Sequence, residues 1–167
     1  MRTKKSLCFL VGLFIIMVWI WGFATPALSE TLKCKGEGKQ VNRSQDNFEG
    51  PTFIGITAGE GTISCDNGAT ATSKTFSLWD AHYQVECFTQ THTVLKFKDS
   101  SKIFIKYKYT QLPDPKNEVE WIWDGTGEIV RGTGQFYGIK GTSTLKGKQL
   151  YPDKNSVSEI TLTYTLK

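Results

Sequence analysis

The sequence predicts an all-β fold, a single antiparallel and closed β-barrel of about eight strands. Short runs of β-branched and aromatic residues alternate with turn signals, and glycines recur inside the runs. From residue 30 onward, no segment has the apolar spacing of an amphipathic helix. A β-sandwich is the alternative. We favour the barrel because closure removes exposed strand edges and calls for glycines that bend the strands.

The region 118–148 carries the clearest signal for a curled sheet. It contains seven of the sixteen glycines, at positions 125, 127, 132, 134, 138, 141 and 147, between residues that favour strands. Glycine inside strand-like sequence marks a bulge, a tight bend or a close approach of two backbones. Such regular spacing therefore indicates a sheet that bends repeatedly.

Two runs show the period of two that is typical of strands. Ile103, Ile105, Tyr107 and Tyr109 fall on one face of the first run, and three lysines occupy the other face together with a phenylalanine. The second run, residues 160–166, alternates in the same way between apolar residues and threonines. This pattern predicts antiparallel strands with one packed face and one solvated face.

Turn signals separate the predicted strands. Asn-Gly within 66–68 and the polar triplet 99–101 each predict a hairpin. Residues 79–81 are expected to turn the chain, and the proline-containing segments 113–117 and 152–155 are expected to form loops.

The N-terminus reads as a signal peptide covering 1–29, followed by one barrel domain covering 30–167. Three basic residues precede an uncharged apolar run over 7–23, and the small residues within 27–29 suit a signal peptidase. The alternative is an uncleaved membrane anchor. Both interpretations predict a secreted or periplasmic domain, which touches a membrane only through an uncleaved N-terminal segment.

Charge argues against nucleic acid as a partner. Three of the twenty basic residues lie in the predicted signal, which leaves seventeen bases against sixteen acids in the domain. A nucleic-acid-binding domain is expected to present a clustered positive face.

Three cysteines remain after the signal: Cys34, Cys65 and Cys87. In an oxidising compartment they predict one disulfide and one free thiol. In a simple meander, Cys65 and Cys87 fall on strands two apart, so a pair that includes Cys34 is favoured. The cysteine and histidine spacings predict no metal site, and His82 and His92 are expected to be surface residues.

The segment 132–142 reads Gly-Thr-Gly-Gln-Phe-Tyr-Gly-Ile-Lys-Gly-Thr. It resembles the barrel shared by allene oxide cyclases and dirigent proteins, and most closely the secreted bacterial members of that superfamily. The resemblance implies an eight-stranded antiparallel barrel with a mostly apolar lumen. It also makes a homo-oligomer possible, because the plant relatives are trimers. Its motif glycines, Gly132, Gly134, Gly138 and Gly141, have a structural role in that family, and the resemblance assigns no catalytic residue here.

Four aromatic residues are the candidate ligand-binding site: Tyr107, Tyr109, Trp121 and Trp123. Aromatic side chains supply a large contact area with a polar tip, as a small apolar ligand would need. The alternative is that these side chains merely fill the barrel.

The leading hypothesis is therefore a non-catalytic barrel without a cofactor, which binds a small apolar molecule or serves as a structural module. A cyclase-like or isomerase-like enzyme is the first alternative, and it requires an inward carboxylate such as Glu86 or Glu128. The second is a protein- or glycan-interaction module with an exposed apolar patch. Glu128 and Arg131 are expected to form a solvated pair at a turn. The motifs of common hydrolases and nucleotide-binding proteins are missing from the sequence.

Overall fold

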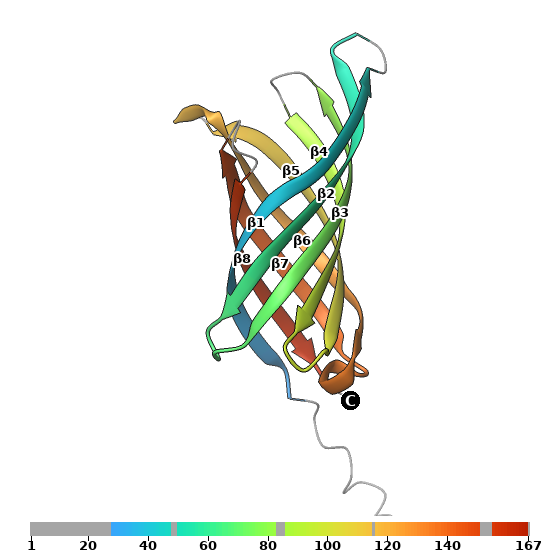
Figure 1. Ribbon diagram of the computed structural model, residues 1–167, viewed down its shortest axis with the longest axis vertical. Helices are drawn as coiled ribbons and strands as arrows, with labels where there is room; N and C mark the ends of the chain where they lie inside the picture. Colours follow the sequence, from blue (N-terminus) through green and yellow to red (C-terminus); the bar gives the residue numbers. More distant parts are fainter. Residues whose placement is uncertain (1–27, 48–49, 83–85, 115, 151–154, 167) are drawn as a thin grey trace, which may run out of the picture.

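The protein is an eight-stranded antiparallel barrel in which each strand pairs with its neighbours in sequence order, and β1 pairs with β8 to close the sheet (Figure 1). The computed structural model describes residues 28–47, 50–82, 86–114, 116–150 and 155–166. The strands are β1 (Glu30–Asn47), β2 (Thr52–Cys65), β3 (Thr70–His82), β4 (Glu86–Phe97), β5 (Lys102–Asp114), β6 (Asn117–Thr133), β7 (Lys140–Leu150) and β8 (Asn155–Thr165). A short 3₁₀ helix, η1 (Gly134–Phe136), lies between β6 and β7. The predicted closed barrel is confirmed.

The strands are longer than the sequence patterns predicted. The turn expected at 79–81 is wrong, because β3 runs through it with unbroken pairing to β2 and β4. The loop expected at 113–117 is largely absorbed by β5 and β6, which pair as far as Asp114 and Asn117. Tilted strands in a small barrel need this length to cross from end to end. Residues 1–27 and 151–154 lie outside the described part of the chain, so most of the predicted signal and the second proline loop do too.

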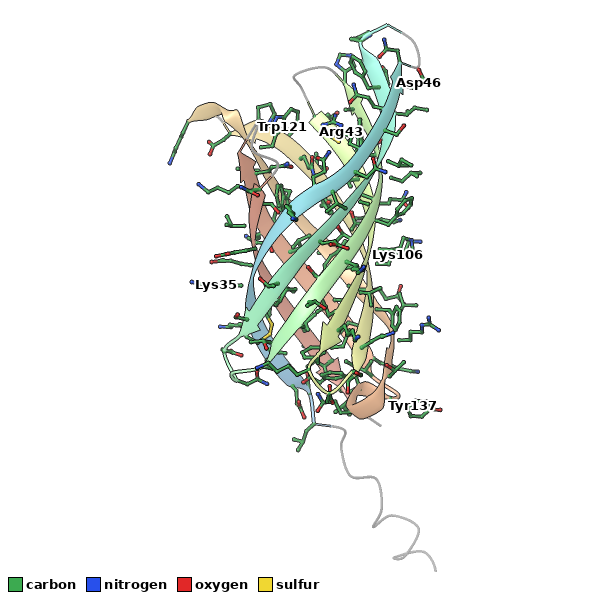
Figure 2. All side chains as sticks on the ribbon, in the orientation of Figure 1. Lys35, Arg43, Asp46, Lys106, Trp121 and Tyr137 are labelled. Carbon is green, nitrogen blue, oxygen red and sulfur yellow. A yellow bond between two sulfur atoms is a disulfide. The ribbon has the colours of Figure 1, made fainter. Side chains whose placement is uncertain are left out.

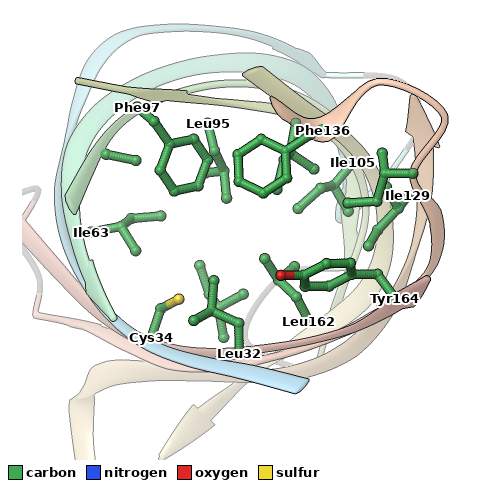
Figure 3. Packing of buried hydrophobic residues seen from close by; sticks show 14 of the residues in the cluster. Leu32, Cys34, Ile63, Leu95, Phe97, Ile105, Ile129, Phe136, Leu162 and Tyr164 are labelled. Carbon is green, nitrogen blue, oxygen red and sulfur yellow. The ribbon is translucent and has the colours of Figure 1, made fainter. Parts of the chain in front are cut away.

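One end of the lumen is packed solid with apolar side chains (Figure 3). Ile103 and Leu162 are completely buried at its centre, and Leu95 is almost as inaccessible. The packed end is the end at which β1 begins and the β2–β3 and β4–β5 hairpins turn. This apolar cluster closes the barrel on that side.

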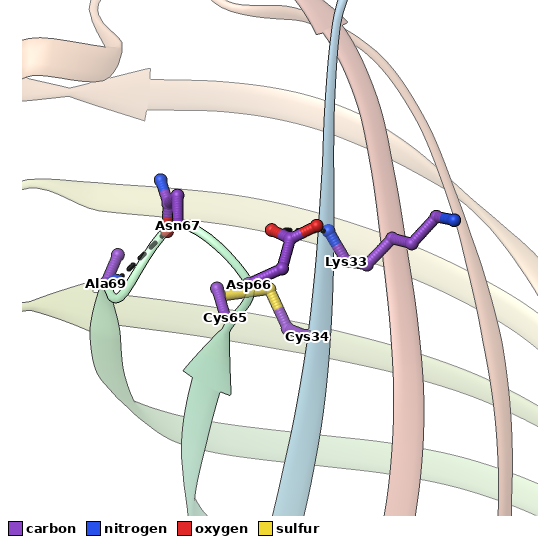
Figure 4. The surroundings of a disulfide bond; sticks show 6 residues. All are labelled: Lys33, Cys34, Cys65, Asp66, Asn67 and Ala69. Atoms are coloured by element: carbon purple, nitrogen blue, oxygen red, sulfur yellow. Dashed lines mark hydrogen bonds between the residues drawn. A yellow bond between two sulfur atoms is a disulfide. The ribbon is translucent and has the colours of Figure 1, made fainter.

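A disulfide joins Cys34 to Cys65 across β1 and β2 at the packed end (Figure 4). The preference for a pair that includes Cys34 is therefore confirmed, and Cys87 is a free, buried thiol. The predicted Asn-Gly hairpin comes directly after Cys65 in the chain. Gly68 has a positive φ of 81° and donates its backbone N–H to the Cys65 carbonyl at 3.0 Å.

The glycine-rich motif folds inward at the packed end. Gly134 and Gly138 have positive φ angles of 63° and 78°, which side-chain-bearing residues seldom adopt. The bends place η1 across the end of the barrel and bury Phe136. Its ring lies 4.8 Å from that of Phe97 and meets Tyr164 edge-on at 6.4 Å. The motif therefore builds a plug.

Among the described residues, no helix is both long enough and apolar enough to span a membrane.

Glycine and aromatic residues face each other across neighbouring strands inside the barrel. Gly127 pairs with Tyr107, and a Cβ atom at this glycine would lie 2.5 Å from the tyrosine ring. The same arrangement recurs along the lumen. The other directly opposed pairs are Gly125 with Tyr109, Gly147 with Trp123, and Gly55 with Trp79. The rings of Tyr107, Trp123 and Trp79 therefore lie against bare backbone of the adjacent strand, and Gly125 leaves room for the Cα and Cβ atoms of Tyr109.

Replacing Gly127 with alanine is expected to lower the free energy of unfolding by about 1–3 kcal/mol, because Tyr107 is fully buried and cannot move away. Urea unfolding measures the effect. The matched control is Gly59→Ala. Its new methyl group meets the Thr75 hydroxyl at 2.6 Å, a side chain that can rotate into the lumen, and the Lys39 carbonyl oxygen at an ordinary contact distance of 3.4 Å. Equal losses of unfolding free energy in both variants would contradict the pairing. So would a loss for Gly127→Ala that is as large in a Tyr107→Leu background as in the parent protein.

Candidate ligand-binding cavity

The other half of the lumen is hollow. A cavity of about 490 Å³ extends from the apolar cluster toward the end of the barrel where β1 finishes and β2 begins. Figure 2 places Arg43 and Trp121 near this end and Tyr137 at the packed end. A volume of this size is typical of sites for small organic molecules.

All four predicted aromatic residues line this cavity. Tyr107 lies at its floor, where its hydroxyl is 2.7 Å from the Ser143 hydroxyl. Tyr109 and Trp123 stand above it with ring centroids 6.5 Å apart, and Trp121 is further toward the mouth. Phe53 and Trp79 are two further aromatic lining residues that were not predicted, and Trp79 lies in the segment expected to turn.

The wall formed by β3 and β4 is lined with hydroxyl groups. Ser77 and Thr91 approach to 2.7 Å, and Thr91 also lies 3.1 Å from the Tyr109 hydroxyl. Among the described residues, no buried side-chain polar atom lacks a hydrogen-bond partner. The remaining hydroxyl residues of this wall are Ser73, Thr75, Thr89 and Thr93. The cavity therefore combines an aromatic wall with a polar wall in which Ser77, Thr91 and Tyr109 are hydrogen-bonded to one another.

The lumen stays open because glycines occupy the wall opposite the aromatic residues. Gly38 on β1 pairs directly with Gly61 on β2, and Gly36 and Gly59 lie next to this pair on the cavity wall. Side chains at Gly36, Gly38 and Gly59 would take up part of the cavity. Only the glycines at 125–147 were predicted to shape the barrel, so this second group was not predicted.

Cys87 lines the mouth of the cavity and is 6% exposed. Its thiol lies 3.6 Å from the Thr89 hydroxyl. Burial raises the pKa of Cys87, and this effect outweighs the opposing influence of the Thr89 hydrogen bond. The thiol is therefore protonated and weakly nucleophilic near neutral pH.

The two carboxylates named for the enzymatic alternative, those of Glu86 and Glu128, do not line the cavity. Glu128 is exposed on the outside of β6, and Glu86 is half-buried at the start of β4; neither is a lining residue. The guanidinium carbon of Arg131 lies 4.2 Å from the centre of the Phe104 ring, and Arg131 does not line the cavity. Both histidines are exposed on the barrel surface, and the described residues contain no cluster of metal-ligating side chains.

The outer surface has its own groove, of about 1030 Å³, across the strands near the open end. It is lined in part by exposed apolar side chains. Leu78 and Phe88 are 58% and 53% exposed, and Ile54 and Ile56 lie beside them on β2. Apolar exposure of this kind is what the interaction-module alternative requires.

The chain matches no family model, and none of the curated proteins matches it. Among solved structures, the chain is similar to that of the pterocarpan synthase dirigent protein GePTS1. The two align with a TM-score of 0.55 and 12% sequence identity, over 84% of this chain and 92% of that chain. The chain therefore has a dirigent-like barrel fold, in agreement with the resemblance of its glycine motif. At this identity the likeness concerns the fold alone.

Ionisation of Tyr107 is expected to link stability to alkaline pH. Burial raises its pKa to about 12, whereas tyrosine in an unfolded chain titrates near 10. The native state thus holds this proton more tightly. The stability that Tyr107 contributes is complete below pH 10 and is lost as the pH rises through 12.

We therefore expect Tyr107→Phe to be less stable than the parent by about 1 kcal/mol at pH 8, through loss of the Ser143 hydrogen bond. By pH 11 the parent should lose about 1.4 kcal/mol of stability relative to Tyr107→Phe, because phenylalanine cannot ionise, so the difference should disappear or change sign. Urea unfolding of both proteins in a Cys87→Ser background avoids thiol exchange at high pH. A difference that does not change with pH would show that Tyr107 is not shielded in the native barrel.

Proposed function

We propose that the protein is a secreted or periplasmic barrel that binds a small, largely apolar molecule in its lumen without transforming it. The observation that carries the proposal is the cavity of about 490 Å³ with one aromatic wall and one hydroxyl wall. Apolar pockets with a few placed polar groups are the usual form of small-molecule sites. Tyr107, Tyr109, Trp121 and Trp123 would supply most of the contact area.

The chemistry of the lining supports binding over catalysis. General acid–base catalysis works best with a group whose pKa lies near the working pH. In this cavity burial raises the pKa values of Tyr107, Tyr109 and Cys87, so these groups remain protonated and neutral. The proposed secretion is supported by the Cys34–Cys65 disulfide, since such bonds persist in oxidising compartments.

The neutral dye phenylnaphthylamine provides a direct test. Its flat apolar body should enter the cavity, bind with one-to-one stoichiometry and accept excitation energy from the lumenal tryptophans. Fluorescence titration of the purified protein gives the dissociation constant.

A leucine at position 38 is expected to fill the cavity and weaken dye binding at least about tenfold, because Gly38 faces the lumen. Lys35→Leu is the matched control on the same strand, since Lys35 is exposed and does not line the cavity. Circular dichroism during heating verifies that both variants remain folded. Bound dye should also protect Cys87 from alkylation by N-ethylmaleimide.

Two results would overturn the proposal: no saturable binding to the parent protein, or binding that Gly38→Leu leaves intact. A loss of binding in Leu78→Ser instead would assign the dye to the outer groove and favour the interaction-module alternative.

A further inference from the structure

A β-bulge in β1 changes which side chains enter the lumen near its mouth. Up to Gln40, even-numbered residues of β1 face inward. The pairing with β2 shifts between Gln40 and Asn42, so Val41 is the extra residue. Beyond it the odd-numbered Arg43 and Gln45 line the cavity, while Ser44 and Asp46 line the outer groove. Bulges commonly re-aim side chains in this way beside functional sites.

The bulge brings Arg43 onto an aromatic platform. Its guanidinium carbon lies 4.6 Å from the centre of the Trp79 ring. The Trp79 indole N–H donates to the Thr57 hydroxyl at 2.9 Å, and Thr57 is the direct cross-strand partner of Arg43. Trp79 is itself buried. The cation is therefore held over a fixed ring at the entrance of the cavity.

The deeper lining is uncharged. The charged residues whose backbones contribute to the wall, Glu37, Lys39 and Glu60, have exposed side chains on the outer face, and Glu60 pairs with Lys74 at 3.0 Å. Among the described lining residues, the inward side chains below the mouth are hydroxyls, amides, aromatic rings and aliphatic groups. Asp80, beside Trp79 in sequence, belongs to the outer groove.

We infer that Arg43 binds the anionic end of an amphiphilic ligand whose flat, uncharged body occupies the lumen. This inference rests on the proposed function and specifies its ligand class. An uncharged lumen cannot accept a buried carboxylate or sulfonate without a large desolvation cost, so an anionic group must stay at the mouth. Arginine suits this role because its planar donors match a carboxylate or sulfonate and remain charged at every physiological pH.

The amide groups near Arg43 extend the same polar rim. Gln45 follows it on β1, and Gln111 and Gln149 reach the cavity from β5 and β7. Amides can donate hydrogen bonds to an anion without adding charge. The geometry thus separates a polar mouth from an aromatic and hydroxyl interior, which is the distribution that an amphiphile with one charged end requires.

Two dyes with the same ring system separate this inference from the proposed function. Anilinonaphthalene sulfonate carries the phenylnaphthylamine body with one added sulfonate. The parent protein is expected to bind the sulfonate dye at least about fivefold more tightly than the neutral dye, and the preference should diminish with added salt.

Arg43→Gln is expected to weaken binding of the sulfonate dye about tenfold while changing binding of the neutral dye less than about twofold. Arg43→Lys should retain part of the preference, because it keeps the charge but loses the planar donors. Lys35→Gln removes a cation from the outer face of the same strand and should leave both affinities unchanged.

If the neutral dye binds in the cavity and the sulfonate dye shows no preference, this inference is overturned and the proposed function stands. Equal losses for both dyes in Arg43→Gln would also overturn it, since Arg43 would then act only by positioning Trp79. If neither dye binds the parent protein, the proposed function fails and the inference fails with it.

Discussion

The structure depends on the contact between a lumenal aromatic ring and the glycine directly opposite it on the next strand. Tyr107 illustrates the constraint, since its ring occupies the space that a side chain at Gly127 would need. A small barrel has too little interior for large side chains on every inward position. Opposing each ring with bare backbone solves the problem of volume and lets the strands remain closely paired. The same device is used for Trp79 and Trp123, and Gly125 leaves room for the Cβ atom of Tyr109.

Two groups of glycines thus have different consequences along one barrel. Those on β6 and β7, together with Gly55 on β2, accommodate aromatic side chains and help to form a wall, whereas Gly36, Gly38 and Gly59 on β1 and β2 line the cavity. At the packed end, buried side chains from β1 to β6 and β8 meet in the centre, half-buried Leu145 of β7 packs against them, and Phe136 and Ile139 fold in from the β6–β7 connection. The barrel is therefore filled where large side chains converge and hollow where glycines replace them on one side.

The sequence predicted the architecture well because alternation, hairpin signals and glycines all reported the same closed sheet. It predicted the lumen less well because parts of β3 and β4 place polar residues inside the barrel and apolar residues outside. Ser77 and Thr91 face inward, while Phe76 and Leu78 face outward and are half-exposed. An interpretation that assigns apolar residues to the interior misses this wall, and the turn expected at 79–81 left Trp79 out of the predicted lining. The bulge at Val41 could not be predicted either, because no glycine or proline marks it, yet it reverses the facing of every later residue of β1.

The hydroxyl wall has a consequence for what the cavity can accept. Because Ser77, Thr91 and Tyr109 already satisfy one another, the empty cavity carries little cost in unmet hydrogen bonds. A ligand without polar groups can therefore cover these three hydroxyl groups without leaving them unpaired, and a ligand with a hydroxyl can exchange bonds with the network. Selectivity then comes from shape against the aromatic wall and from charge at the mouth. A lining of this kind discriminates weakly among uncharged ligands of similar shape and strongly against a charged group deep in the cavity.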